Sequence, residues 1–284
     1  MIKKTLTFSN KAYLSYKLKQ LVIRRENPVT NEEEVITRPI EDIGIIMIES
    51  GQVTLTSALI SHLVENNVGV IFCDSRHMPI NMILPLQANT LQSEKSIAQI
   101  QASLPLKKQL WQQTVAAKIF NQGVVLGKVA GVETGNMFKW STGVKSGDSD
   151  NLEGRAAAYY WRNMFPETGG FRRDKDGEDS INSFLNYGYA ILRAVVARSL
   201  VISGLLPTLG IHHHNRYNAY CLADDVMEPY RPYVDGLVCE IMESGKDYSM
   251  LTTELKAKLL SLPVVEVGIQ GRRSPLMVAV SQTT

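Results

Sequence analysis

The sequence lacks the marks of secreted and membrane proteins. No apolar stretch follows the two lysines of the opening segment MIKKTLTFSN, so no signal peptide is expected. The most apolar run, residues 190–209, is interrupted by Arg193, Arg198 and Pro207. A membrane span needs about 20 mostly apolar residues, so this run predicts a buried helix. We therefore expect a cytoplasmic protein without a membrane partner.

Cysteine is scarce. The chain has three cysteines, Cys73, Cys221 and Cys239, and no CxxC pair. This number and spacing fit neither a disulfide framework nor a zinc knuckle. We expect three separate thiols of the kind found in a reducing cytoplasm.

Excess charge of either sign is also missing. The 30 Lys and Arg residues are nearly balanced by 28 Asp and Glu, which gives a formal net charge of +2. This balance excludes a protein that holds nucleic acid by bulk positive charge. The distribution is uneven, because residues 91–140 hold six basic and two acidic side chains. A local basic surface that attracts nucleic acid is therefore compatible with the total.

The spacing of the hydrophobic residues, which make up 44% of the chain, changes along the sequence. Up to residue 85, seven short β-like runs are separated by turn residues, and one helix is predicted at 56–65. The strands are predicted at 5–8, 13–17, 21–25, 35–37, 44–48, 68–73 and 80–84. Beyond residue 86 the pattern is helical, with helices predicted at 106–122 (ended by Gly123), 151–165, 180–204 and 224–242.

These patterns predict an α+β protein. A small, β-rich and sandwich-like domain is expected at residues 1–86, and a linker at 87–100. A larger all-α domain is expected at residues 101–284.

Histidines and carboxylates gather in the second half of the chain. Three consecutive histidines, His212 to His214, follow the residues that end a long predicted helix. Asp225 and Glu228 lie three positions apart, so on a helix they would share one face. Imidazole and carboxylate ligands together suit Mn²⁺ or Mg²⁺. Taken alone, each group also has a structural explanation, as a polar turn or as acidic residues in a first helical turn.

A further carboxylate, Glu153, opens another predicted helix. With Asp150 as the N-cap residue, Glu153 stands at capping-box spacing. Local sequence therefore favours a capping role for Glu153 over a catalytic one.

Three segments together resemble the CRISPR-associated integrase, the large catalytic subunit of the spacer-acquisition complex. They are NLEGRAAAYYW, INSFLNYGYAILRAVVARSLVISGLLPTLGIHHHN and NAYCLADDVMEPYRPYVD. The similarity extends to the β-rich part and the C-terminal tail, and it is greatest to the compact variant found in single-effector systems. Such a protein is a metal-dependent DNA endonuclease and integrase that acts in a prokaryotic cytoplasm. It joins the 3′-hydroxyl ends of foreign DNA fragments to the CRISPR repeat by transesterification.

The resemblance also implies roles for individual residues. The metal-binding, catalytic positions of the family fall on Glu153, His213 and Glu228. Asp225 falls on an acidic position that is either a further ligand or a support for one, and the ion would be Mg²⁺ or Mn²⁺.

The implied partners are double-stranded DNA, a second copy of the chain in a homodimer, and a small companion subunit. Phosphate contacts would make DNA binding fall with salt. The basic residues predicted to make them are Lys107, Lys108, Lys118, Lys128, Arg172, Arg173 and Arg231.

Two other functions fit the same residues. A structure-selective DNA repair nuclease would use the metal site to cut DNA without joining it. A DNA-binding scaffold without catalytic activity would make no covalent product at all.

Overall fold

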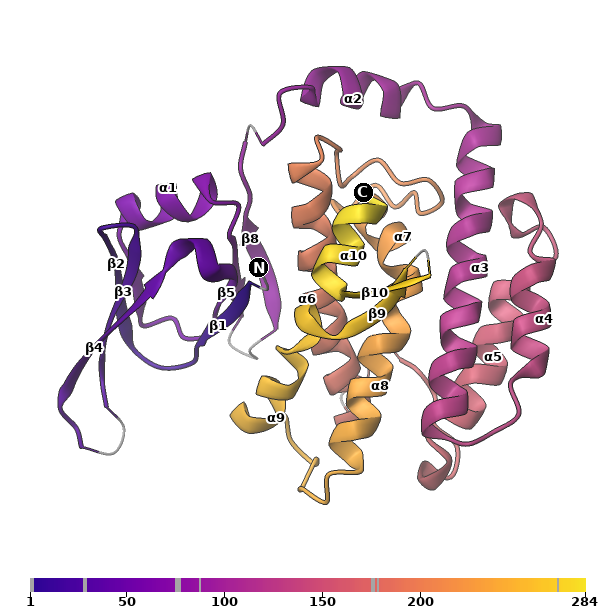
Figure 1. The fold of residues 1–284 in the computed structure, drawn as a ribbon. Coiled ribbons are helices and arrows are strands. Elements are labelled where there is room, and N and C mark those ends of the chain that lie inside the picture. The colour runs from indigo at the N-terminus through magenta and orange to yellow at the C-terminus, as the bar shows by residue number, and fades with distance from the viewer. Residues whose placement is uncertain are drawn as a thin grey trace. The chain divides into compact units, whose positions relative to one another are not determined.

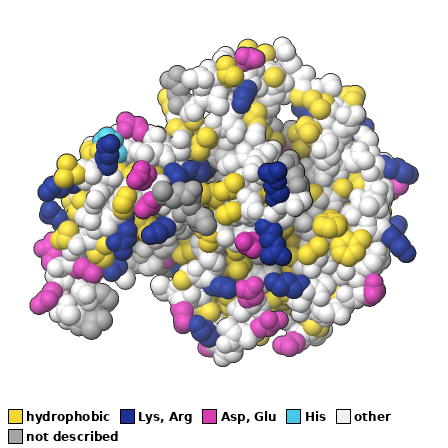
Figure 2. Space-filling view, in the orientation of Figure 1, with side chains coloured by type: hydrophobic (Ala, Val, Ile, Leu, Met, Phe, Trp, Pro, Cys, Tyr) yellow, Lys and Arg dark blue, Asp and Glu magenta, His cyan; other side chains and the backbone are white. Residues whose placement is uncertain are grey.

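The protein forms two compact units, which are described separately (Figure 1). One comprises residues 1–90 with 201–203, and the other comprises residues 91–200 and 204–284. This computed structural model describes all residues except 1–2, 28–29, 75–77, 87, 175–176, 178 and 270. The first unit is rich in strands and the second in helices, which confirms the predicted α+β class. On the face shown in Figure 2, Lys and Arg side chains are interspersed with Asp and Glu, as the balanced composition requires.

Two four-stranded sheets form the β-rich unit. One has the strand order β1-β5-β7-β8, in which β5 pairs in parallel with β1 and β7. The other has the order β4-β3-β2-β6, with antiparallel pairing of β2, β3 and β4. All seven predicted strands are present, and the short β6 is additional. The strands are β1 (Lys4–Phe8), β2 (Ala12–Lys17), β3 (Gln20–Glu26), β4 (Glu33–Pro39), β5 (Ile43–Ile48), β6 (Val53–Leu55), β7 (Gly69–Cys73) and β8 (Pro79–Ile83).

The core of this unit lies between the sheets and helix α1 (Ser57–Glu65). Strand β5, with the sequence IGIIMI, is buried along its whole length, because both of its faces are covered. Leu14 and Leu21 from one sheet meet Leu59 and Leu63 from α1 in a single hydrophobic cluster.

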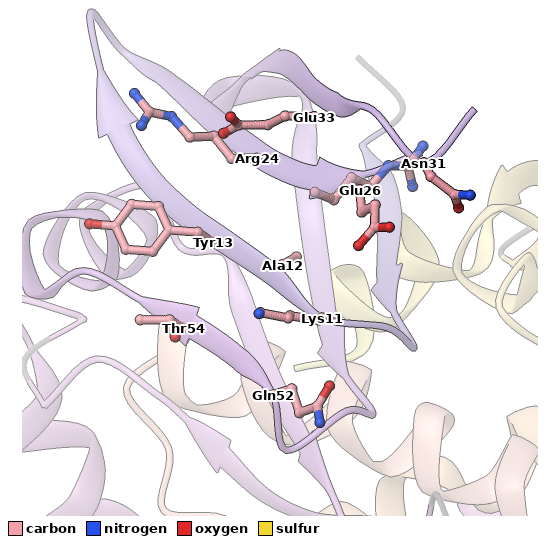
Figure 3. Close-up of a pocket in the computed structure, with 10 residues that line it drawn as sticks. Lys11, Ala12, Tyr13, Arg24, Glu26, Asn31, Glu33, Gln52 and Thr54 are labelled. Carbon is pink, nitrogen blue, oxygen red and sulfur yellow. The ribbon is translucent and has the colours of Figure 1, made fainter. Parts of the chain in front are cut away.

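A hollow lies on the β4-β3-β2-β6 sheet (Figure 3). Lys11, Tyr13, Arg24, Glu33 and Thr54 are among its lining residues, and no histidine or cysteine of the described part of the chain lines it. None of the predicted catalytic residues lines this hollow, so the chemistry predicted from the sequence has to be sought in the helical unit.

The helical unit is built around α6 and the long helix α3. Almost every residue of α6 from Ile181 to Leu200 is buried. Helix α6 is long and apolar enough to span a membrane, but 72% of the relevant window is buried, as in the core helix of a soluble protein. The helices are α2 (Gln92–Ile100), α3 (Leu104–Val129), α4 (Gly135–Gly143), α5 (Leu152–Met164), α6 (Ser180–Ile202), α7 (Cys221–Met227), α8 (Arg231–Met242), α9 (Thr253–Leu259) and α10 (Leu276–Thr283).

This unit differs from the prediction in several details, and α4, α9 and α10 are helices that were not predicted from the sequence. The segment 87–100, expected as a linker, contains α2. Helix α3 continues through Gly123, which lets α4 pack closely, since a Cβ there would lie 3.1 Å from the ring of Phe138. The helix predicted at 224–242 is divided by a 3₁₀ turn at Glu228–Tyr230. The unit is not all-α, because β9 (Glu266–Ile269) and β10 (Arg272–Pro275) form a hairpin.

Candidate active site

Glu153 lies in the first turn of α5, whose start is capped by other side chains. Asn151 is the N-cap residue, and its side chain accepts a hydrogen bond from a first-turn N–H. The Asp148 carboxylate accepts the first two N–H groups of the helix, at 2.9 and 3.0 Å. The predicted capping box of Asp150 and Glu153 is therefore wrong. The carboxylate of Glu153 is free for another role, and it accepts a hydrogen bond from Lys118 Nζ at 2.6 Å.

Glu228 stands where the chain turns between α7 and α8. Pro229, at the next position, interrupts the helical hydrogen bonding and marks the break. The Glu228 side chain is buried, with an exposed fraction of 6%, and forms ion pairs with Lys118 at 2.6 Å and Arg231 at 2.9 Å. Burial alone would raise the pKa of Glu228, but Arg231, Lys118 and His213 outweigh it and lower the pKa. The group is therefore a buried, ionised carboxylate near neutral pH.

Asp225 holds the histidine loop in place. Its fully buried carboxylate accepts the backbone N–H groups of Ile211, His212 and His213 at 2.7, 3.0 and 3.1 Å. The same carboxylate lies 2.6 Å from His213 Nδ1. Gly210 makes room for this arrangement, because a Cβ there would approach Asp225 Oδ2 to 2.9 Å and the His213 carbonyl oxygen to 2.3 Å.

This contact fixes the ring of His213. Because an ionised carboxylate can only accept, Nδ1 of His213 carries a proton, and Nε2 is the nitrogen left for another partner. The hydrogen bond to Asp225 raises the pKa of His213. The side chain is 43% exposed, so the ring is partly accessible to solvent.

Trp111 of α3 supports the same loop. Its indole ring is stacked on the ring of His212, with centroids 4.0 Å apart and planes inclined by 3°. It also meets the His213 ring edge-on at 5.9 Å. Trp111 is 2% exposed. His212 is thus a packing residue that helps to place His213, a role that the run of three histidines does not reveal in sequence.

Lys118 joins the two glutamates. Its Nζ lies 2.6 Å from an oxygen of Glu153 and 2.6 Å from an oxygen of Glu228, so these oxygens are no farther apart than twice that distance. Burial would lower the pKa of Lys118, but the two carboxylates outweigh it and raise the pKa. The sequence predicted a phosphate contact for Lys118, whereas the structure pairs it with the carboxylates.

Asp224 points away from these groups, as its position next to Asp225 requires. Its carboxylate accepts from Arg193 Nε at 2.7 Å and from Asn218 Nδ2 at 2.6 Å. It therefore fastens α7 to α6 and to the loop before α7.

A buried polar network lies behind Glu228. Asp235 of α8 accepts hydrogen bonds from the hydroxyls of Tyr160, at 2.8 Å, and Tyr189. The guanidinium groups of Arg231 and Arg173 lie 4.8 and 5.3 Å from the ring centre of Tyr189. Tyr160 belongs to α5, which carries Glu153 in its first turn, so Asp235 connects this helix to α8, which follows the Glu228 turn. Burial raises the pKa of Asp235 to about 6.

Asp235→Asn is expected to remove a pH dependence of stability. The folded-state pKa of Asp235, about 6, lies above that of an unfolded chain, about 3.9. The folded protein therefore binds the extra proton, and this contribution to stability falls as pH rises from about 4 to 6. The difference in unfolding free energy between wild type and variant should fall by about 3 kcal/mol over this range. Urea unfolding from pH 4 to 7 measures it, and parallel curves would contradict the assignment.

The residues predicted to contact DNA have different surroundings. Lys108 and Arg172 are exposed, and Lys107 is partly exposed. Arg173 donates to two asparagine side chains of α6, at 2.8 and 2.6 Å. Arg231 is engaged by Glu228 and by the Tyr189 ring. Lys128 is exposed as well. Lys107, Lys108, Lys128 and Arg172 are thus the predicted contacts most accessible to a phosphate, and DNA contact by any of these residues stays a prediction.

The chemistry of these side chains fits a divalent ion. Two carboxylates, Glu153 and Glu228, already converge on one positive charge, the ammonium of Lys118, and His213 offers Nε2. Among the described residues, no three His, Cys, Asp or Glu side chains lie close enough together to hold an ion as they stand. Two carboxylates and an imidazole are donors of the kind that suit Mg²⁺ or Mn²⁺, and in this structure the Lys118 ammonium lies between the two carboxylates.

Comparisons with known proteins agree with the sequence resemblance. The family described as "CRISPR associated protein Cas1" matches residues 6–261. The chain is 34% identical to the CRISPR-associated endonuclease Cas1 of Neisseria meningitidis over 285 aligned residues, covering 98% of this chain and 89% of the relative.

Two solved structures share the fold. A casposase bound to its integration product has a TM-score of 0.79 at 22% identity, covering 99% of this chain and 88% of the casposase. A Cas6-RT-Cas1–Cas2 complex has a TM-score of 0.71 at 20% identity, covering 99% of this chain and 34% of the larger one.

Proposed function

The chain belongs to the Cas1 family of CRISPR-associated endonucleases and acts as an integrase and endonuclease of CRISPR adaptation, and from this premise we propose a metal site. In this proposal, Glu153, His213 and Glu228 bind the divalent ion, Mg²⁺ or Mn²⁺, with which the protein joins DNA strands. The observation that supports this proposal most directly is the convergence of Glu153 and Glu228 on a single cation. The orientation of His213 by Asp225 is the second support.

The proposed reaction is a transesterification. The 3′-hydroxyl oxygen of a DNA fragment forms a bond to a phosphorus atom of the CRISPR repeat, and the bond from that phosphorus to the 3′ oxygen of the repeat strand breaks. The proton of the attacking hydroxyl ends on the departing 3′ oxygen. One phosphodiester replaces another, so no ATP is consumed. When bound, the divalent ion supplies a Lewis acid that activates the hydroxyl and neutralises charge on the phosphate.

The side chains have separate tasks in this scheme. Glu153 and Glu228 supply negative charge, and the lowered pKa of Glu228 keeps it ionised. Arg231 fixes the orientation of Glu228 through its other oxygen, and Asp225 holds the proton of His213 on Nδ1. Because these supporting contacts exist within the chain, the side chains of Glu228 and His213 are oriented before DNA binds.

We also propose the partners of the reaction. Double-stranded DNA is the substrate, in keeping with the integration product held by the casposase that shares this fold. A small companion subunit is expected from the Cas1–Cas2 assembly with the same fold. As in the family, the chain would work as a homodimer and in a prokaryotic cytoplasm.

The product separates this function from its alternatives. The purified protein and its companion subunit would be given a labelled DNA duplex with free 3′-hydroxyls and a supercoiled plasmid carrying a CRISPR repeat. With Mg²⁺ or Mn²⁺, label covalently joined to the plasmid is the expected result, and a chelator should abolish it. Cutting without joining would indicate a repair nuclease, and no covalent product with either metal would indicate a scaffold.

A further inference from the structure

Lys118 occupies the point between the two glutamates where a cation is most needed. Its side chain is 13% exposed, and those of Glu153 and Glu228 are 25% and 6% exposed. Two carboxylates this close repel each other strongly when water is largely excluded. The single positive charge of the ammonium relieves this repulsion, which explains why a lysine can be buried here.

The main chain around Lys118 is held in place. One turn further along α3, Asn121 Nδ2 donates to the carbonyl oxygen of Pro229 at 2.7 Å, which fastens α3 to the turn that bears Glu228. Earlier on the same helix, Gln112 Nε2 donates to the Val144 carbonyl at 2.6 Å. The helix is therefore anchored on both sides of Lys118, and the part free to move is its flexible four-carbon stem.

The ammonium and a divalent ion would compete for the same oxygens. A Mg²⁺ ion binds oxygen at about 2.1 Å, whereas Lys118 Nζ lies 2.6 Å from one oxygen of each glutamate. A divalent ion on both of these oxygens would lie against the ammonium, which has no lone pair to offer and carries charge of the same sign. One of the two cations has to leave. The divalent ion neutralises the charge of both carboxylates, whereas the ammonium neutralises the charge of only one.

We propose that Lys118 is a built-in counter-ion, which holds Glu153 and Glu228 together before metal binds and which a divalent ion must displace to bind them. This inference rests on the metal site of the proposed function. It makes Lys118 a positioning residue that lowers the affinity for metal and stabilises the metal-free protein.

Metal titration of the Lys118→Met variant tests the displacement. Methionine keeps the apolar stem and removes the charge. The variant should unfold at a lower temperature than wild type without metal, bind Mn²⁺ about tenfold more tightly or better, and gain more thermal stability from Mn²⁺. Lys128→Met is the matched control, because Lys128 is exposed near the end of the same helix. Unchanged or weaker Mn²⁺ binding by Lys118→Met would overturn the proposal.

A second measurement uses the wild-type protein and does not depend on the variant's folding. Acetylation of lysines by a water-soluble reagent, read by mass spectrometry, should modify Lys118 slowly without metal and at least several times faster with Mn²⁺. The rate at Lys128 should not change. Equal rates at Lys118 with and without Mn²⁺ would show that the ammonium is not displaced.

Different results would contradict the proposed metal site and the proposed role of Lys118. If the metal site is wrong, Glu228→Gln will bind Mn²⁺ as wild type does. If only the role of Lys118 is wrong, Glu228→Gln will lose Mn²⁺ binding while Lys118→Met and the acetylation rate show no effect.

Discussion

Glu228→Gln is expected to lower DNA strand joining by about a thousandfold or more. The substitution keeps the shape of the side chain and removes the charge that balances Lys118 and Arg231. Loss of a ligand to the catalytic ion removes several kcal/mol of transition-state stabilisation. Glu153→Gln and His213→Ala should have effects of similar size. Initial rates of fragment joining to a repeat-bearing plasmid, at saturating Mg²⁺ or Mn²⁺, measure this effect.

The matched control for this experiment is Glu240→Gln. Glu240 lies on α8, the helix that follows the Glu228 turn, but its side chain is 44% exposed and pairs with Lys258 at the surface. This variant should join DNA as wild type does, and DNA binding should survive in all four variants. Joining at the wild-type rate by a folded Glu228→Gln or Glu153→Gln protein would falsify the site assignment.

Asp225→Ala should both destabilise the protein and impair joining. The change leaves three backbone N–H groups and His213 Nδ1, all partly buried, without the buried carboxylate that accepts their hydrogen bonds. Each unsatisfied buried group costs about 1–3 kcal/mol, so a loss of about 3 kcal/mol or more in unfolding free energy is expected. Joining should fall roughly a hundredfold, because His213 loses the group that orients it.

Two further variants separate the effect on stability from the effect on DNA strand joining. Asp225→Asn keeps one accepting oxygen, so its loss of stability should be smaller than that of Asp225→Ala. Asp150→Asn is the control, because Asp150 is exposed and pairs with Lys145 at the surface. Chemical denaturation gives the stability, and the plasmid assay gives the rate. Asp225→Ala with wild-type stability would contradict the hydrogen-bonding scheme.

Local sequence patterns predicted most of the fold. Alternation and turn residues located seven of the eight strands of the β-rich unit, and hydrophobic spacing located α3, α5 and α6. The predicted ends of helices were less accurate at residues that can serve two structural roles. A glycine such as Gly123 can end a helix or allow another helix to pack closely. Here it allows close packing, because Phe138 lies against it. Pro229 lies within the helix predicted at 224–242, and the 3₁₀ turn that contains it divides that helix.

The site was predicted only in part, because its supports are contacts between distant residues. Motif similarity gave Glu153, His213 and Glu228, whereas local reasoning gave Glu153 a capping role that Asn151 and Asp148 perform instead. Lys118 is 35 positions from Glu153 in sequence, and no local pattern distinguishes it from the surface lysines of the same helix. Pairing over such separations becomes visible only when α3 is packed against α5 and the Glu228 turn.

The most direct measurement of the central claim is a crystal structure of the protein grown with Mn²⁺, with anomalous diffraction recorded for that ion. We expect the ion that gives the anomalous peak to be bonded to Glu153, Glu228 and His213 Nε2, with Lys118 Nζ withdrawn from both carboxylates. A peak at other residues, or Lys118 still paired with both glutamates and no peak between them at saturating Mn²⁺, would contradict this claim.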